Sequence, residues 1–127
     1  MNRRNIAALL ALALWTSGCA ALLVGTGAGV YSYIEGELRR AYPADLAPAL
    51  EAVRQALDGL KIRIESTDAD GVTTLLKAKR SDGTPVTVKV SRLSPGVVEI
   101  GVRSGFVGLW DRRFSELIHA TISQRLL

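Results

Sequence analysis

His119 is the sole histidine of this 127-residue chain, and Cys19 is its sole cysteine. Zinc sites and hydrolase triads combine several such side chains with carboxylates. Glu116 lies three residues before His119 and would be its neighbour on a helix, but every further partner would have to come from elsewhere. We therefore predict no catalytic residues, no metal, no cofactor and no enzymatic activity, and we expect His119 to be a partly exposed helix residue.

The acidic segment Asp68-Ala69-Asp70-Gly71 has some features of a calcium-binding loop. An EF-hand loop needs a third oxygen ligand and a distal glutamate at fixed spacing, and neither follows here. We interpret this segment as a turn between two strands.

The residues before Cys19 predict a different chemistry for its thiol. Arg3 and Arg4 precede an apolar run over residues 6–15, and three small residues then lead to Cys19. This order is typical of a secretory signal peptide. It also resembles the lipobox of bacterial lipoproteins, with Thr16 where leucine is usual. The resemblance implies cleavage before Cys19 and acylation of its thiol, so that acyl chains hold the protein on a membrane.

Three segments are expected: a signal peptide over residues 1–18, a lipid-anchored, glycine-rich apolar tether over residues 19–41, and a folded domain over residues 42–127. Ala20 after the cysteine favours the periplasmic side of the outer membrane of a Gram-negative bacterium, by the sorting convention of that protein class. An alternative stays open, because residues 6–24 are largely apolar and a membrane-spanning helix needs about 20 such residues. In that case the N-terminal helix would remain uncleaved in the membrane.

The first element of the domain is an amphipathic helix over residues 45–60. Apolar residues recur there at steps of three and four, at Leu46, Leu50, Val53, Leu57 and Leu60. Asp45 is the expected N-cap, Pro48 falls in the first turn, and Gly59 is expected to stop the helix.

The hydrophobic period then changes from 3.6 to 2, which predicts four strands. Apolar residues alternate with polar ones over residues 60–65, 86–91 and 98–103, and a fourth run covers residues 72–80. Asp82-Gly83 predicts a hairpin turn. A final helix opened by Asp111 is expected to bury one face, formed by Trp110, Phe114, Leu117, Ile118, Thr121, Ile122 and Arg125.

These elements predict an α+β fold with the order α-β-β-β-β-α. We expect a two-layer sandwich in which a four-stranded antiparallel meander carries both helices on one face. The chain also resembles a known family of small bacterial lipoproteins of unknown function. The resemblance rests on Cys19, the glycines of residues 25–29, Glu35-Gly36-Glu37-Leu38, Tyr42-Pro43 and the hairpin Lys79-Arg80-Ser81-Asp82-Gly83-Thr84-Pro85-Val86-Thr87. The resemblance implies a lipid-anchored location in the bacterial envelope and the α+β fold, and the family carries no assigned activity.

The alternation places six basic residues on the open face of the sheet, with only Glu65 and Glu99 opposing them. The six are Lys61, Arg63, Lys77, Lys79, Lys89 and Arg103. Such charges keep a bare sheet soluble and its edges unpaired, and they also suit an anionic partner such as a lipid headgroup, an envelope polymer or an acidic protein. Nucleic acid is not expected outside the cytoplasm.

Two aromatic residues near the last helix, Phe106 and Trp110, suggest a docking loop, although core capping is the more common role of such residues. The sequence thus predicts a membrane-anchored lipoprotein that acts as a binding or structural module. A domain that binds a small, lipid-like ligand between its helices and sheet is the alternative.

Overall fold

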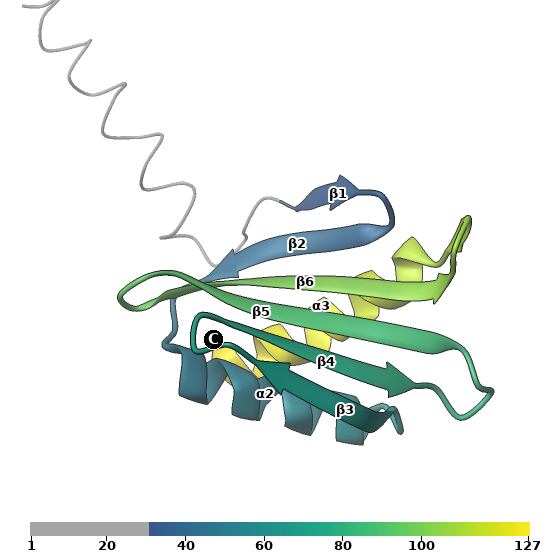
Figure 1. Cartoon of the computed structure of the whole chain (residues 1–127), viewed down its shortest axis with the longest axis horizontal. Helices are drawn as coiled ribbons and strands as arrows, with labels where there is room; N and C mark the ends of the chain where they lie inside the picture. Colours follow the sequence, from purple (N-terminus) through teal and green to yellow (C-terminus); the bar gives the residue numbers. More distant parts are fainter. Residues whose placement is uncertain (1–30) are drawn as a thin grey trace, which may run out of the picture.

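A computed structural model describes residues 31–127. Two helices and seven strands form in this part of the chain (Figure 1). In chain order they are β1 Ser32–Ile34, β2 Glu37–Tyr42, α2 Leu46–Gly59, β3 Arg63–Ala69, β4 Thr73–Lys79, β5 Pro85–Ser94, β6 Val97–Phe106, β7 Leu109–Trp110 and α3 Arg112–Leu126.

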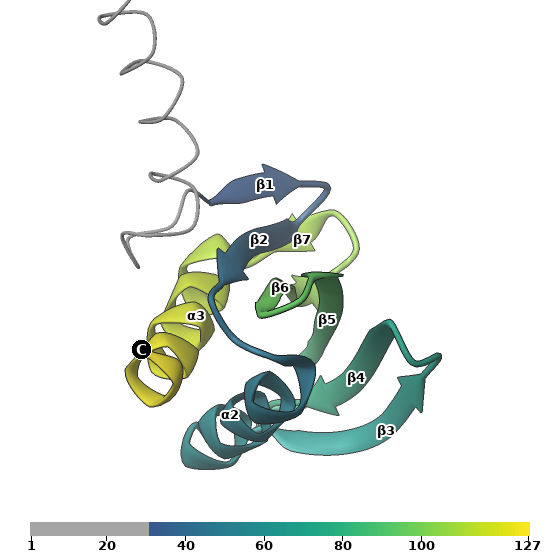
Figure 2. The same cartoon turned by 90° about the vertical axis from the view of Figure 1, so that its left-hand side faces the viewer.

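The strands form one antiparallel sheet with the order β1-β2-β6-β5-β4-β3, and β7 pairs with β6. Both helices lie on the same face of this sheet, side by side (Figure 2). The predicted α+β class with an antiparallel sheet and two helices is therefore confirmed. The predicted count of four strands and the order α-β-β-β-β-α are wrong, because β1 and β2 precede the first helix and β7 precedes the last.

The two N-terminal strands come from residues that the sequence analysis assigned to a tether and its lead-in. β1 and β2 are joined by Glu35 and Gly36, which both have positive φ, at 50° and 81°. Positive φ at both central residues is the requirement of a two-residue hairpin turn. β2 then pairs with β6 along its whole length, from Glu37 opposite Arg103 to Tyr42 opposite Val98.

Helix α2 buries a stripe that differs from the predicted one. Its buried residues are Ala49, Ala52, Val53, Ala56 and Leu57, and three of the four predicted leucines are only partly buried. Small alanine side chains let the helix backbone approach the sheet closely, so the leucines lie along the margins of the interface. Asp45 occupies the N-cap position but makes no side-chain capping bond.

The meander from β4 to β6 follows the predicted period. The first strand, predicted over residues 60–65, is displaced, because residues 60–62 cap the end of the helix and β3 spans Arg63–Ala69. The turns lie at residues 70–72, 80–84 and 95–96, and the second includes the predicted Asp82-Gly83. Two irregularities were not predicted: the register shifts between Arg92 and Ser94 of β5, and a β-bulge between Ile64 and Ser66 inserts Glu65 into β3. After this bulge the alternation of β3 changes phase, so that Asp68 lies opposite Leu75 of β4.

Helix α3 begins as predicted, since the Asp111 carboxylate accepts a hydrogen bond from the Phe114 amide at 3.0 Å. Its buried face consists of Ser115, Ile118, His119 and Ile122. Leu117, which was expected on this face, is 47% exposed. Between helices and sheet lies one continuous core, to which every strand from β2 to β6 contributes. Burial of each large apolar side chain in it contributes roughly 1.5–3 kcal/mol.

Candidate anion-binding site

The open face of the sheet carries five of the six predicted basic residues, whereas Lys61 lies in the turn after α2 and belongs to no strand. Lys61, Arg63, Lys77, Lys79 and Lys89 are exposed, and Arg103 is half-buried. Arg103 differs because its guanidinium lies over the Trp110 ring, 5.1 Å from the ring centroid. The structure does not bring the six together into one patch. Lys61, Arg63 and Lys79 lie at the end of the sheet near the β4–β5 turn, whereas Lys77, Lys89 and Arg103 lie along its length.

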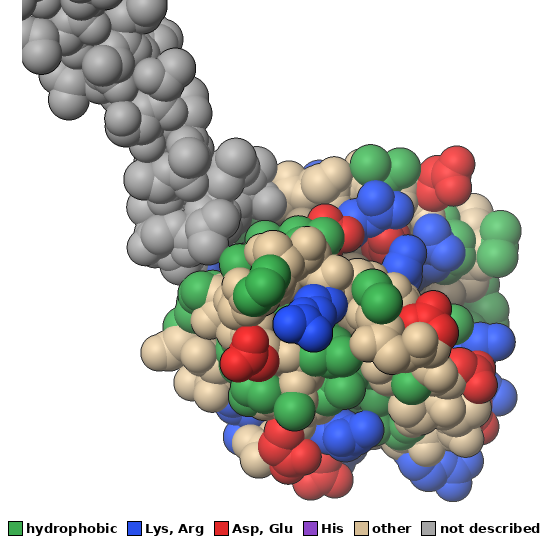
Figure 3. All heavy atoms as spheres, turned by 60° about the vertical axis from the view of Figure 1, so that its left-hand side comes forward, with side chains coloured by type: hydrophobic (Ala, Val, Ile, Leu, Met, Phe, Trp, Pro, Cys, Tyr) green, Lys and Arg blue, Asp and Glu red, His purple; other side chains and the backbone are tan. Residues whose placement is uncertain are grey.

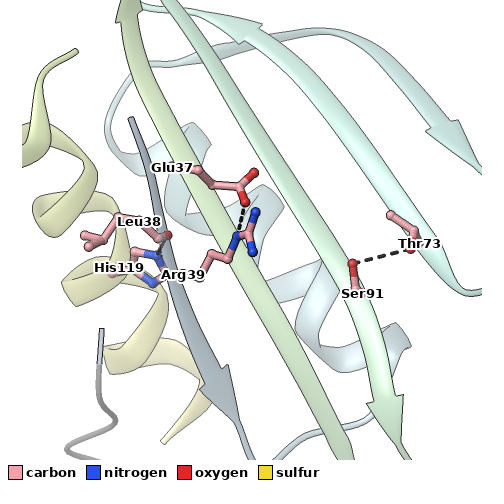
Figure 4. A network of polar contacts seen from close by, with 6 residues as sticks. All are labelled: Glu37, Leu38, Arg39, Thr73, Ser91 and His119. Atoms are coloured by element: carbon pink, nitrogen blue, oxygen red, sulfur yellow. Dashed lines mark hydrogen bonds and ion pairs between the residues drawn. The ribbon is translucent and has the colours of Figure 1, made fainter. Parts of the chain in front are cut away.

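The same face is more acidic than the sequence predicted. Strand β2 adds Glu37 and Arg39, which form an ion pair on the side of β2 away from α3 (Figure 4). Glu37 is only 9% exposed, because its side chain lies across Gly101, where a Cβ atom would come within 2.7 Å of the Glu37 carboxyl carbon. The bulge in β3 brings Asp68 to this face as well. Figure 3, which brings one end of the sheet forward, shows basic and acidic side chains interspersed on the side that it presents.

Four basic residues converge on one cleft of about 370 Å³, which we call the basic cleft. It is lined by Lys61, Arg63, Lys79, Arg80, Ser81 and Gly83. Lys61 follows α2, Arg63 begins β3, Lys79 ends β4, and the other three residues belong to the β4–β5 turn. Arg80 was not among the predicted site residues, although it stands next to Lys79 in the hairpin motif.

The cations of the basic cleft are neutralised unequally. Lys79 lies 3.7 Å from a Glu65 carboxylate oxygen, and Arg80 lies 3.6 Å from Asp111 and over the Phe114 ring. Within residues 31–127, no carboxylate lies within 4.0 Å of Lys61 or Arg63. The cleft therefore has two unpaired positive charges, which favour an anion.

The predicted docking loop divides into a structural and an exposed half. Trp110 packs directly over Gly36, where a Cβ atom would lie 2.3 Å from the indole ring. Phe106 is 57% exposed, and the neighbouring Val107 and Leu109 are still more exposed. Trp110 therefore holds the β1–β2 hairpin against the end of β6. Within this loop, the apolar side chains exposed to solvent are those of Phe106, Val107 and Leu109.

The prediction for His119 is wrong, because its side chain is completely buried. Its Nε2 lies 2.7 Å from the Leu38 carbonyl oxygen, and its Nδ1 lies 2.8 Å from the Tyr42 hydroxyl (Figure 4 shows the first of these contacts). A carbonyl only accepts hydrogen bonds, so Nε2 carries the proton and Nδ1 accepts from Tyr42. Since both ring nitrogens are engaged, this imidazole has no free nitrogen for a substrate or a metal.

His119 belongs to a larger group that we call the histidine cluster: Tyr31, Arg40, Tyr42, His119 and Ser123. Arg40 is 7% exposed, with its guanidinium over the rings of Tyr31 and Tyr42 and 3.3 Å from the Ser123 hydroxyl. Burial lowers the pKa of His119 to about 4, and the charge of Arg40 contributes to this shift, while the bond to Leu38 opposes it. The cluster joins β2 to α3, and sequence reasoning missed it because its members lie far apart in the chain.

The acidic segment at residues 68–71 is divided, since Asp68 and Ala69 end β3 and the turn begins only at Asp70. The Asp70 carboxylate accepts hydrogen bonds from the amides of Thr73 at 2.7 Å and Val72 at 3.0 Å, and these bonds lower its pKa. A cleft of about 280 Å³ lies beside this turn. Within residues 31–127, no three His, Cys, Asp or Glu side chains are grouped so that they could hold a metal ion.

Both clefts are lined by the open face and its turns, whereas the space between helices and sheet is filled by core side chains. The predicted signal peptide, the lipidation of Cys19 and the glycine-rich segment lie outside the described residues. In the part of the chain that is described, neither helix has the length and apolar character needed to cross a membrane.

This chain is similar to a known protein and matches the model of a protein family. Over 103 residues it is 31% identical to a protein described as cobalt-precorrin-5B C(1)-methyltransferase from Methanoculleus marisnigri. That similarity covers 79% of this chain but only 29% of the methyltransferase. The second match is a family profile that spans residues 5–125 and includes the basic cleft and the histidine cluster. On this match the chain belongs to the family described as "Protein of unknown function (DUF3568)".

Proposed function

We propose that this chain is a lipoprotein of the bacterial cell envelope, anchored by acyl chains on Cys19, and that the open face of its sheet binds an anionic partner without catalysing a reaction. The proposal places it on the periplasmic side of a Gram-negative outer membrane. Support for the anchor comes from the sequence, in which a cationic start, an apolar run and small residues lead to Cys19.

One observation carries the binding role. Four of the six predicted cations, Arg63, Lys77, Lys79 and Lys89, are exposed on the open face, while the other face of the sheet is covered by both helices. Among the described residues, the only ion-pair partner of these four is Glu65, which pairs with Lys79. Positive charges spread over one face complement the potential of an anionic surface, so they suit its recognition.

The anchor is tested with Cys19→Ser in cells supplied with radiolabelled palmitate. We expect the variant to incorporate no label and to keep the precursor mass, because the hydroxyl cannot replace the thiol in the acylation. Ser17→Ala, which keeps the cysteine, is the matched control and is expected to be labelled. Normal labelling and processing of Cys19→Ser would contradict the anchor.

The basic face is tested by reversing the charges of Lys77, Lys79 and Lys89 to glutamate. The chain should begin at Ala20, so that neither the signal peptide nor an acyl chain contributes to binding. Phosphatidylcholine vesicles with added phosphatidylglycerol are the anionic probe. We expect the triple variant to bind them more weakly, and the difference to shrink at high salt because ions screen exposed charges beyond about 10 Å at 0.1 M.

The matched control reverses three exposed arginines of the helical layer: Arg54, Arg113 and Arg125. It makes the same change in net charge on other elements, so it should leave vesicle binding much closer to that of the parent. Equal binding by the parent and the Lys77, Lys79, Lys89 variant would refute the binding role and leave solubility as the function of these charges.

A further inference from the structure

Lys61 has a backbone conformation that usually requires glycine. The amide of Ile62 donates to the Leu57 carbonyl at 2.8 Å, and the amide of Lys61 donates to the Asp58 carbonyl at 3.0 Å. These two bonds form a Schellman motif, which places Lys61 at the left-handed position just after the helix. Its φ is 57°. A side chain at this φ strains the backbone, whereas glycine adopts it freely. Gly59, which the sequence suggested as the helix stop, is instead the last helical residue.

The side chain of Lys61 lines the basic cleft together with Arg63, Lys79 and Arg80. Arg63 lies directly opposite Lys79 on the neighbouring strand. Like charges at directly opposed positions of a sheet repel each other. The cleft thus combines a strained backbone, a repulsive cross-strand pair and two cations without a carboxylate partner in residues 31–127. Each of these destabilises the unliganded fold, and one anion in the cleft would relieve the charge repulsion.

We propose that the basic cleft binds a phosphate monoester, which deepens the proposed function by assigning its site and its ligand chemistry. A phosphate monoester carries a charge of about −1.5 to −2 at neutral pH, which matches the two unpaired cations better than a single carboxylate does. The planar guanidinium of Arg63 suits phosphate oxygens, and the ammonium of Lys61 adds a point charge. A volume of about 370 Å³ leaves room for part of the molecule that carries the phosphate.

A structural explanation for Lys61 competes with this proposal. A lysine at the C-terminal end of a helix interacts favourably with the helix dipole. That explanation predicts that lysine stabilises the folded state at this position, whereas the strain at φ 57° predicts that glycine would stabilise it more. Lys61→Gly separates the two explanations, because it removes the charge and relieves the strain in one change.

The experiment uses the full chain in neutral detergent micelles and follows the backbone amide signals of Ser81 and Gly83 by NMR. Inorganic phosphate is the soluble probe, and phosphatidic acid mixed into the micelles is the lipid probe. We expect phosphate to shift both signals in the parent. In Lys61→Gly we expect the apparent Kd to rise about fivefold to tenfold, because one of two unpaired charges close to the anion is lost. The midpoint of denaturant unfolding should rise at the same time.

Arg54→Ala is the matched control, since it removes one exposed positive charge from α2, outside both the basic cleft and the open face of the sheet. We expect it to change the Kd for phosphate less than twofold. If phosphatidic acid shifts the same two signals, the phosphate belongs to a membrane headgroup. If only inorganic phosphate shifts them, it belongs to a soluble compound.

Three results would overturn the proposal: no shift of Ser81 and Gly83 with either probe, an equal loss of affinity in Lys61→Gly and Arg54→Ala, or a lowered unfolding midpoint in Lys61→Gly. All three leave the broader binding role intact as long as charge reversal of Lys77, Lys79 and Lys89 still weakens vesicle binding. Failure of that separate experiment would refute the proposed function itself.

Discussion

His119 is neutral in the folded protein, because both of its nitrogens are committed to internal hydrogen bonds. The protonated ring would be a donor at both nitrogens, and it would lose the bond that Nδ1 accepts from the Tyr42 hydroxyl. It would also bring a second positive charge next to the buried Arg40. Burial of the Tyr42 hydroxyl raises its pKa too, so Tyr42 remains a donor throughout the range in which His119 titrates.

This arrangement predicts a loss of stability in acid. His119 has a pKa of about 4 in the folded protein and about 6.5 when unfolded, so the unfolded chain takes up the proton first as the pH falls. The contribution of neutral His119 is complete above pH 6.5 and is lost as the pH falls toward 4. Between pH 7.5 and pH 5, we expect the free energy of unfolding to fall by about 2 kcal/mol from this group.

His119→Gln is the comparison for this prediction, because carboxylates also titrate in acid and contribute to both proteins. Denaturant unfolding at the two pH values should show that the parent loses about 2 kcal/mol more than the variant. Equal losses in the two proteins would mean that His119 does not resist protonation.

At the scale of elements, the β1–β2 hairpin depends on one close contact. Gly36 has a φ of 81°, and the Trp110 ring covers the place where a Cβ atom would lie. Trp110 in turn is held by β7, which pairs with the end of β6. The hairpin therefore has two connections to the rest of the sheet, the β2–β6 pairing and this indole contact.

Gly36→Ala is expected to destabilise the protein more than an alanine substitution at a glycine that has a positive φ but no atom near its missing Cβ. Gly71→Ala is the matched control, since Gly71 has a φ of 92° with no atom near its missing Cβ. We expect Gly71→Ala to lower the free energy of unfolding by about 1 kcal/mol, and Gly36→Ala to lower it by about 2–4 kcal/mol because the indole must also move. Urea unfolding measures both, and equal values would show that the Trp110 contact is not tight.

The basic cleft also forms at the scale of elements, where the ends of a helix and of two strands meet. The end of α2, the start of β3 and the β4–β5 turn meet at one end of the sheet, and each supplies part of the lining. Arg63 could be predicted on the open face from the sequence alternation, whereas Lys61, which was expected there too, lies in the turn after α2. The convergence of Lys61 and Arg63 with Arg80 could not be predicted, because it depends on the path by which the chain leaves α2.

At the scale of the whole molecule, strand β2 contacts elements from the C-terminal part of the described chain. It pairs with β6, and it supplies Arg40 and Tyr42 to the histidine cluster, whose other members include His119 of α3. Helix α2 follows β2 and leads to β3 at one edge of the sheet. The folded part therefore includes residues 32–42, most of which were expected to form a tether. If Cys19 is the anchor, the domain is held closer to the membrane than a tether of residues 19–41 would place it.

Local sequence patterns determined much of this architecture. The period of two over residues 86–91 and 98–103, the Asp82-Gly83 turn and the Asp111 cap are properties of neighbouring residues, so they could be predicted without a structure. The strand predicted over residues 60–65 was displaced, because the C-terminal cap of α2 takes residues 60–62. The exposure of Arg63, Lys77, Lys79 and Lys89 followed from the alternation. The lipid anchor on Cys19, and with it the location of the protein in the cell envelope, was likewise inferred from adjacent residues, and it remains a prediction.

Only the tertiary structure decided which residues meet across the chain. Arg40 faces the helical layer from a position where alternation predicts an apolar residue, and this hid β2 in the sequence. His119 is buried because Leu38 and Tyr42 satisfy its nitrogens, although about 80 residues separate them in the chain. A polar side chain can be buried when partners satisfy its hydrogen bonds, and those partners are distant in sequence, so no local pattern records them.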